Sequence, residues 1–330
     1  MAGPKRNPVA VGILLGLGLL TKAYFLTISL AVFAWLAFAA WRSRSGAAVR
    51  RLLPVAVAAP AIAGWWYWET WRTTGSFSGE LHDVAFHRLG FGEWLQAARR
   101  VSWMRVLDAT FCSHIWAGTW SYLSVRSWMY HAFALLAVAG AAGVVWVVVR
   151  EHMTVKPVAA NLAAVRMTIF LLTVFALGLV YHAVTIYAAH GMSAVNGWYI
   201  DSLVAGEAVL WALGLMAFLP PPRRAYVIPL LALAFLVLDV FAMHIYLLPY
   251  YAGFIAHTQG NHLPALKLGQ LASGGWRTLF ERLAVNKPAW LSVGGIVALW
   301  AGYVLASCGT AAVAWRMARR TRPLPDRRDY

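Results

Sequence analysis

The sequence carries little charge for its length. Only 12% of its 330 residues are charged and 61% are hydrophobic, whereas soluble domains of average composition are about 25% charged. Acids are the scarcest, with 12 Asp and Glu against 28 Lys and Arg. This deficit excludes an ordinary soluble enzyme and predicts an all-α, polytopic membrane protein. The basic residues are interspersed between apolar segments, so the net charge of +16 fits membrane topology better than nucleic-acid binding.

Cysteines and the motifs of soluble enzymes are also missing or rare. There is no phosphate-binding G-x-x-x-x-G-K-[ST], no G-x-S-x-G, no H-E-x-x-H and no C-x-x-C. The two cysteines, Cys112 and Cys308, are expected at different membrane depths, so we predict no disulfide between them. His257 and His262 are five residues apart in a loop, a spacing with little metal specificity. We therefore predict no metal site and no cofactor.

Eight apolar segments are present, which predicts a bundle of about eight transmembrane helices. They cover residues 8–21, 23–41, 52–68, 128–149, 166–189, 199–219, 225–249 and 291–315. Basic clusters fall in alternate gaps and at both ends, and together hold 17 basic residues against three acidic ones. Positive charge marks the cytoplasmic side. Both termini are therefore predicted inside, in an integral membrane protein of the bacterial inner membrane.

Lys22 is the only charged residue in the apolar run 8–41. As one helix, that run would be about 51 Å long, against a hydrocarbon core of about 30 Å. A lysine within hydrocarbon costs roughly 2.5–3.5 kcal/mol on insertion scales. We therefore predict a helical hairpin that turns at Thr21-Lys22, with the lysine at the outer surface.

Two long outer segments and a tail complete the predicted organisation. Residues 1–315 form the transmembrane domain, with outer loops at 69–127 and 250–290, and residues 316–330 form a basic cytoplasmic tail near anionic lipid. Within the first loop, residues 91–107 have the spacing of an amphipathic helix lying in the membrane interface.

Polar residues inside predicted spans are the first candidate site. Glu207, Asp239 and His182 lie within about 6 Å of one another in depth, counted at 1.5 Å per residue from the inner ends of their spans. Asp201 stands near the start of its span. Intramembrane acids are functional candidates, although a hydrogen-bonded interior pair or a water-filled cleft also explains them.

Aromatic residues at the outer span ends are the second candidate site. Trp68 ends the third span and Arg72 follows it, while His190, Trp198 and Tyr199 flank the start of the sixth. Such residues form the interfacial aromatic belt. They also suit a groove in which aromatics stack on a sugar or isoprenoid while Lys22 or Arg72 binds phosphate.

Four stretches carry a resemblance to a known family. GLGLLTK, GWWYWETWRTTGSFSG, SHIWAGTWSYLSVRSWMY and VNGWYIDSLVAGEAVLWALGL resemble, in this order, stretches of GT-C-type membrane glycosyltransferases. The closest groups are the protein O-mannosyltransferase and aminoarabinose-transferase kind, with a related family of uncharacterised bacterial membrane proteins. The resemblance covers roughly residues 9–220. Trp198 replaces an arginine that the family often has there, which puts phosphate binding at this position in doubt.

The resemblance implies a polyprenyl-phosphate-linked sugar donor and an inverting transfer at the outer face. The family's catalytic acid, in the first outer loop, has no matching position here, and a divalent metal is expected only if an absent upstream acidic loop is supplied. The chain is therefore expected to be the C-terminal portion of such an enzyme, either a truncated product or one half of a split enzyme that an N-terminal partner polypeptide completes. A non-catalytic membrane protein of related fold that binds lipid or a partner remains an alternative, as does a transporter using Glu207, Asp239 and His182.

Overall fold

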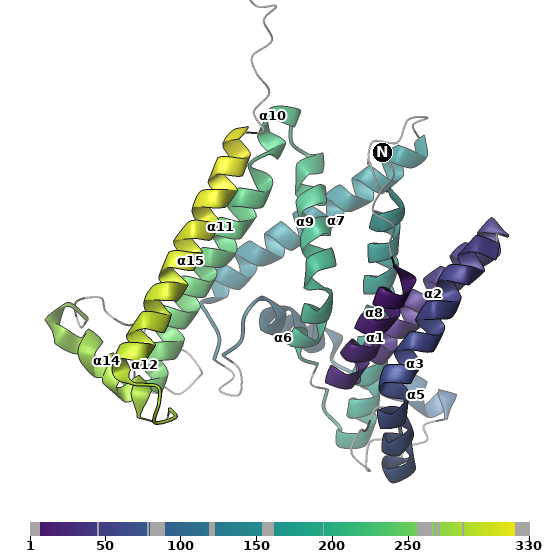
Figure 1. Ribbon diagram of the computed structural model, residues 1–330, viewed down its shortest axis with the longest axis horizontal. Coiled ribbons are helices and arrows are strands. Elements are labelled where there is room, and N and C mark those ends of the chain that lie inside the picture. The colour runs from purple at the N-terminus through teal and green to yellow at the C-terminus, as the bar shows by residue number, and fades with distance from the viewer. Residues whose placement is uncertain are drawn as a thin grey trace, which may run out of the picture. The chain divides into compact units, whose positions relative to one another are not determined.

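The computed structural model describes residues 7–44, 46–77, 79, 90–118, 123–153, 162–193, 195–255, 266, 269, 271–285 and 287–320. All regular secondary structure in these ranges is helical (Figure 1). The chain divides into two compact units, residues 1–114 with 159–207 (unit 1) and residues 115–158 with 208–330 (unit 2). The predictions for His257, His262 and residues 321–330 lie outside the described residues.

Six described helices are long and apolar enough to cross a membrane, which supports the predicted helical membrane protein. They are Phe25–Ser43, Ser127–Arg150, Ala163–His190, Gly197–Ala217, Pro221–Tyr251 and Val293–Arg319. The first predicted span is the shorter apolar helix Pro8–Thr21. The third belongs to a 29-residue helix, Gly46–Thr74, that contains two prolines and is less apolar on average. The count of eight and the inside location of both termini stay predictions.

Unit 1 begins with a helical hairpin. Helix α1 (Pro8–Thr21) ends at Lys22, and α2 starts three residues later and runs from Phe25 to Ser43. Lys22 has an extended backbone as the C-cap of α1, and its carbonyl accepts a hydrogen bond from the amide of Phe25 at 3.1 Å. Its side chain is exposed. The predicted turn at Thr21-Lys22 is therefore confirmed.

Small residues let α1 pack closely against α3 (Gly46–Thr74). A Cβ atom on Gly12 would lie 2.7 Å from the Cβ of Ala58, and one on Gly16 would lie 2.8 Å from the Cβ of Ile62. Glycines four residues apart are typical of close helix pairs in membranes. The phenol of Tyr67 donates to the Leu19 carbonyl at 2.9 Å, which links α3 to the C-terminal turn of α1.

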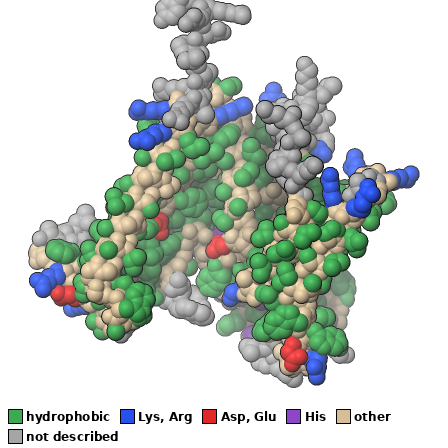
Figure 2. Space-filling model, viewed as in Figure 1, with side chains coloured by type: hydrophobic (Ala, Val, Ile, Leu, Met, Phe, Trp, Pro, Cys, Tyr) green, Lys and Arg blue, Asp and Glu red, His purple; other side chains and the backbone are tan. Residues whose placement is uncertain are grey.

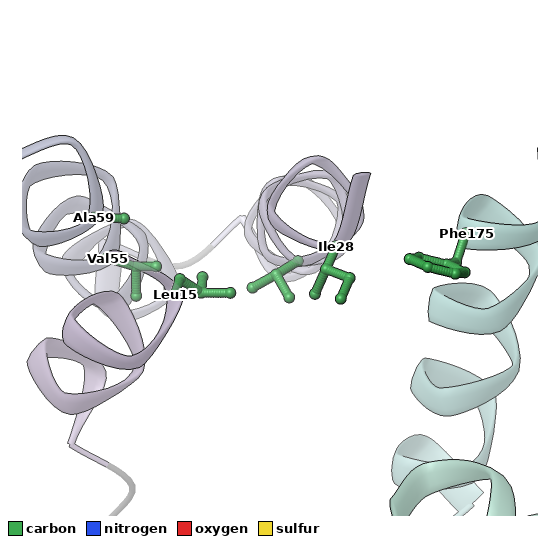
Figure 3. Close-up of a cluster of buried hydrophobic side chains, with 6 residues drawn as sticks. Leu15, Ile28, Val55, Ala59 and Phe175 are labelled. Carbon is green, nitrogen blue, oxygen red and sulfur yellow. The ribbon is translucent and has the colours of Figure 1, made fainter. Parts of the chain in front are cut away.

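A buried apolar cluster joins four helices of unit 1. Leu15 of α1 and Val55 and Ala59 of α3 meet Ile28 of α2, and the ring of Phe175 projects toward them from α8, which spans Leu162–His190 (Figure 3). A second cluster packs two short helices, α5 (Phe91–Arg100) and α6 (Trp103–Ile115), against the later part of α8. The single amphipathic helix predicted over 91–107 is thus wrong in detail, since the backbone becomes extended at Val101.

The sixth predicted span is continuous but changes its helix type. It starts as a 3₁₀ helix, η2 (Gly197–Leu203), and continues as α9 (Val204–Ala217). The change takes place between Asp201 and Glu207, and α9 carries the chain from unit 1 into unit 2.

Unit 2 is built on long apolar helices. Helix α7 (Ser127–Met153) packs backbone to backbone on the later part of α9, where a Cβ on Gly143 would overlap the carbonyl of Gly214. The short α10 (Pro221–Arg224) leads into α11 (Val227–Asp239), which continues through the π-helix η3 (Val240–Leu247) and α12 (Leu248–Tyr251). Helix α15 (Val293–Arg320) runs alongside α11 (Figure 1).

Shorter elements complete unit 2 and include part of the segment predicted as the second outer loop. A π-helical turn, η4 (Leu271–Gly275), precedes α14 (Trp276–Ala284), which packs on α15. Because α15 continues to Arg320, residues 316–320 of the predicted basic tail are helical.

Candidate functional site

A histidine between two carboxylates is the main polar cluster of unit 1. Nδ1 of His114 lies 3.0 Å from Oδ1 of Asp201, and Nε2 lies 2.8 Å from Oε2 of Glu207. The three residues come from α6, η2 and α9, and we call them the His114 triad. The side chains of His114 and Glu207 are only 11% and 18% exposed, whereas that of Asp201 is 57% exposed. The triad therefore runs from an accessible carboxylate to a largely enclosed one.

The geometry of the triad favours a protonated imidazole. An ionised carboxylate only accepts hydrogen bonds, so two carboxylates at the two ring nitrogens are both satisfied when both nitrogens carry protons. Burial lowers the pKa of His114, but the hydrogen bond and charge of Glu207, followed by those of Asp201, outweigh burial and raise this pKa above its usual value. The raised pKa of His114 therefore favours the protonated imidazole over a wider pH range than for an isolated histidine.

Helix α6 holds His114 in place by docking on the segment before η2. The hydroxyl of Thr110 donates to the Val195 carbonyl at 3.1 Å, and the amide of Gly197 donates to the hydroxyl of Ser113 at 2.6 Å. Gly197 is buried, and a Cβ there would overlap the Thr110 carbonyl and the His114 amide nitrogen. Only glycine permits this approach, and the approach brings His114 to both acids.

A cluster of aromatic rings in unit 1 is centred on Tyr199, two residues before Asp201. The ring of Tyr199 lies 5.6 Å from that of Tyr24, 5.9 Å from that of His182 and 6.3 Å from that of Trp198, measured between centroids. Burial raises the pKa of the Tyr24 phenol, and the charge of Asp201 and then Tyr199 add to the rise. The charge of Asp201 therefore acts electrostatically on Tyr24, the residue that directly precedes α2.

Several residues predicted as a phosphate and sugar site fall into this region. Tyr199 and Trp198 are part of the ring cluster, and Lys22 is exposed on the turn that also contains Tyr24. His190 is the last residue of α8 and is exposed. The turn after α1 and the start of η2, far apart in sequence, are thus brought together in unit 1.

Trp68 and Arg72 belong to a separate exposed patch at the end of α3. Arg72 faces Glu69 at 3.6 Å, and the ring of Trp68 lies 5.4 Å from that of Trp71, which stacks in turn on Phe77. Both partners of the ion pair are more than half exposed, so this pair adds little stability. Within the described ranges, no hydrogen bond or ion pair joins this patch to the triad.

The intramembrane layer predicted from Glu207, Asp239 and His182 is divided between the two units. Glu207 and His182 belong to unit 1, where they contact His114 and Tyr199 respectively. Asp239 belongs to unit 2, where it accepts a hydrogen bond from the hydroxyl of Tyr303. The ring of His244 lies 5.1 Å from that of Tyr303. Each acid thus has a partner in its own unit that the depth calculation did not identify.

Sequence reasoning missed His114 itself. It stands in a segment predicted to be an outer loop, 87 residues before Asp201 and 93 before Glu207. The one signal in the sequence is a histidine in the stretch Cys-Ser-His-Ile, which follows an amphipathic pattern and precedes a glycine. This signal is too common to identify an acid–base site.

Neither thiol chemistry nor a metal cluster is indicated at the site. Burial, followed by the charge and hydrogen bond of Asp108, raises the pKa of Cys112 to about 11, so the group stays a thiol near neutral pH. Cys112 and Cys308 are both free, as predicted. Among the described residues, no group of His, Cys, Asp and Glu has the arrangement of a metal site.

Comparison of the chain with protein-family models, with curated proteins and with solved structures gives no match.

Proposed function

We propose that the chain is a membrane protein of the GT-C glycosyltransferase type that binds a polyprenyl-phosphate-linked sugar at the outer face. The observation that carries the proposal is the grouping of the His114 triad with Tyr199, Tyr24 and the turn that bears Lys22. A transferase of this kind needs a cation for phosphate, aromatic surface for a sugar or isoprenoid, and a base for the acceptor. Unit 1 holds all three: the exposed Lys22 two residues before Tyr24, the rings around Tyr199, and the triad.

The triad suits the role of the base. In an inverting transfer, an acceptor hydroxyl attacks C1 of the sugar, the bond from C1 to the phosphate oxygen breaks, and the hydroxyl proton must leave. Asp201 accepts this proton because its carboxylate is 57% exposed. His114 and Glu207 orient Asp201 and compensate the change in charge, as general acid–base catalysis requires. The family's own acid has no counterpart in this sequence, and the triad takes its place.

Lys22 suits the leaving phosphate. Its ammonium group is an exposed point charge with three donors, close in sequence to the Tyr24 ring that packs on Tyr199. Polyprenyl phosphate released from the sugar carries a negative charge that such a group stabilises. The apolar helices beside the turn provide the surface for the isoprenoid chain.

The proposed role of Lys22 in phosphate binding is tested by measuring binding of polyprenyl phosphate to the full chain in nanodiscs. We expect Lys22→Ala to weaken binding about tenfold, because one charge-assisted contact is lost. Lys287→Ala is the matched control, since Lys287 is also an exposed lysine outside the candidate spans and lies in unit 2. Equal binding by Lys22→Ala and wild type would reduce Lys22 to a residue of the turn.

The proposed role of Asp201 as the base is tested by measuring sugar transfer to water or an added alcohol, with polyprenyl-phosphate hexose and pentose as donors. We expect Asp201→Asn to abolish transfer while leaving donor binding intact or tighter, because removal of an anion does not disfavour phosphate. Wild-type binding that depends on Lys22 but gives no transfer from either donor would favour a non-catalytic lipid-binding protein.

A further inference from the structure

An open apolar groove lies on unit 2 between α11 and α15. Its volume is about 910 Å³, and its walls include Ile228 and Ala232 of α11 and Ala306, Gly309 and Val313 of α15. Among the described residues that line it, Arg224 is the only charged one and none is an acid. Both helices are long and apolar enough to cross a membrane, so lipid is the solvent expected around a groove between them.

The groove ends at a cluster of arginines. Nε of Arg224 donates to the Leu219 carbonyl at 3.0 Å, which fixes the guanidinium at the end of α10 and leaves its two NH₂ groups as donors. Arg223 precedes it, and Arg316 and Arg319 lie in the last turns of α15. Lys and Arg side chains gather at this end of α11 and α15 (Figure 2). Guanidinium groups bind phosphate with two parallel hydrogen bonds.

Aromatic rings mark the level of the membrane interface beside these arginines. The centroids of Tyr226 and Trp315 are 6.3 Å apart, and Cζ of Arg319 lies 5.4 Å from the centroid of the Trp315 ring. Tyrosine and tryptophan concentrate where hydrocarbon meets headgroups. The groove then extends along α15 from Ala318 to Ala306, a rise of about 18 Å at 1.5 Å per residue. This is close to half of a hydrocarbon core of about 30 Å, the depth of one leaflet.

We propose that this groove binds one anionic phospholipid, with its phosphate on Arg224 and an acyl chain between α11 and α15. Small side chains also suit contact with another helix, but the described residues of the rim are basic and include no acid, which matches a lipid phosphate. The length of the groove matches an acyl chain. Basic pockets between transmembrane helices bind anionic headgroups in this way. The inference does not depend on the proposed transfer reaction.

Native mass spectrometry of the full chain with phosphatidylglycerol and phosphatidylcholine of identical acyl chains tests the headgroup. We expect one tightly held lipid and a preference for phosphatidylglycerol that falls about fivefold in Arg224→Gln, since a basic group near the membrane surface contributes about 1 kcal/mol. Arg224→Lys should keep part of the preference. The control is Arg277→Gln, because Arg277 is exposed on α14 and pairs with Glu281. An unchanged preference in Arg224→Gln, or an equal fall in the control, would overturn the assignment.

A matched pair of glycine variants tests the acyl chain. Gly309 lines the groove and Gly302 lies two turns away on the same helix, and a Cβ on either meets nothing within 4 Å. Gly309→Leu should fill the groove and reduce retention of both lipids, whereas Gly302→Leu should not. Equal loss in both variants would overturn the proposal. A wild-type dimer that Gly309→Leu dissociates, without any retained lipid, would show instead that a second copy occupies the groove.

Discussion

Units 1 and 2 each hold an acid in an apolar helix, but they satisfy it differently. In unit 1, Glu207 faces a histidine that also faces Asp201, an arrangement that favours an imidazolium between two carboxylates. In unit 2, Asp239 accepts a hydrogen bond from the neutral hydroxyl of Tyr303 and, among the described residues, forms no ion pair. A carboxylate with an ionic partner holds its charge in a poorly solvated place, whereas one with a neutral donor has only a hydrogen bond.

The two clusters also differ in how the chain assembles them. The contact of Asp239 with Tyr303 joins two long helices that lie side by side, so ordinary packing of α11 on α15 brings the partners together. The π-helix that starts after Asp239 changes the turn at this point, a feature that often accompanies functional positions. The His114 triad instead needs a short helix outside the spans to dock on a glycine. The triad is therefore the easier of the two clusters to break, because it depends on the contact at Gly197.

Gly197→Ala should break the docking of α6 and give the largest effect. The added methyl overlaps the Thr110 carbonyl and the His114 amide nitrogen, which are backbone atoms that cannot rotate away. We expect a loss of about 2–3 kcal/mol in the free energy of unfolding, measured in mixed micelles. Gly92→Ala is the control, because a Cβ at Gly92 meets nothing within 4 Å, and alanine in a helix should be neutral or slightly stabilising. Similar losses in the two variants would contradict the close contact.

Glu207→Gln should give an intermediate effect that depends on pH. The amide keeps the shape and one acceptor but removes the less exposed of the two anions beside His114, so we expect a loss of about 1–2 kcal/mol. Since the pKa of His114 is raised in the folded chain, its stabilising contribution is complete below its unfolded pKa near 6.5. That contribution is lost as the pH rises through the folded pKa.

The loss caused by Glu207→Gln should therefore be larger at pH 6 than at pH 9, as urea unfolding of both proteins at the two pH values will show. A loss that stays the same over this range would mean that His114 is neutral throughout.

The sequence predicts the features of this comparison that depend on neighbouring residues. It does not predict those that depend on contacts between residues far apart in the chain. The turn at Lys22 follows from local quantities, the length of an apolar run and the cost of a buried cation. The acids Glu207 and Asp239 stand out because charge is rare in apolar segments. Their partners His114 and Tyr303 cannot be identified in the same way. Helix periodicity does not show which distant helix will contact a given residue. The break at Val101 between α5 and α6 was missed as well, since one amphipathic pattern runs through both.

Asp239→Asn, the same exchange of acid for amide made in unit 2, should give the smallest effect. The amide oxygen still accepts the hydrogen bond from Tyr303, and no cation within the described ranges loses an ionic partner. We expect a change within about 0.5 kcal/mol in the free energy of unfolding, measured in the same micelles. Tyr303→Phe serves as the reference, because it removes the donor and should cost about 1 kcal/mol. If Asp239→Asn proved as costly as Glu207→Gln, Asp239 would need an ionic partner, and the two units would satisfy their acids in the same way.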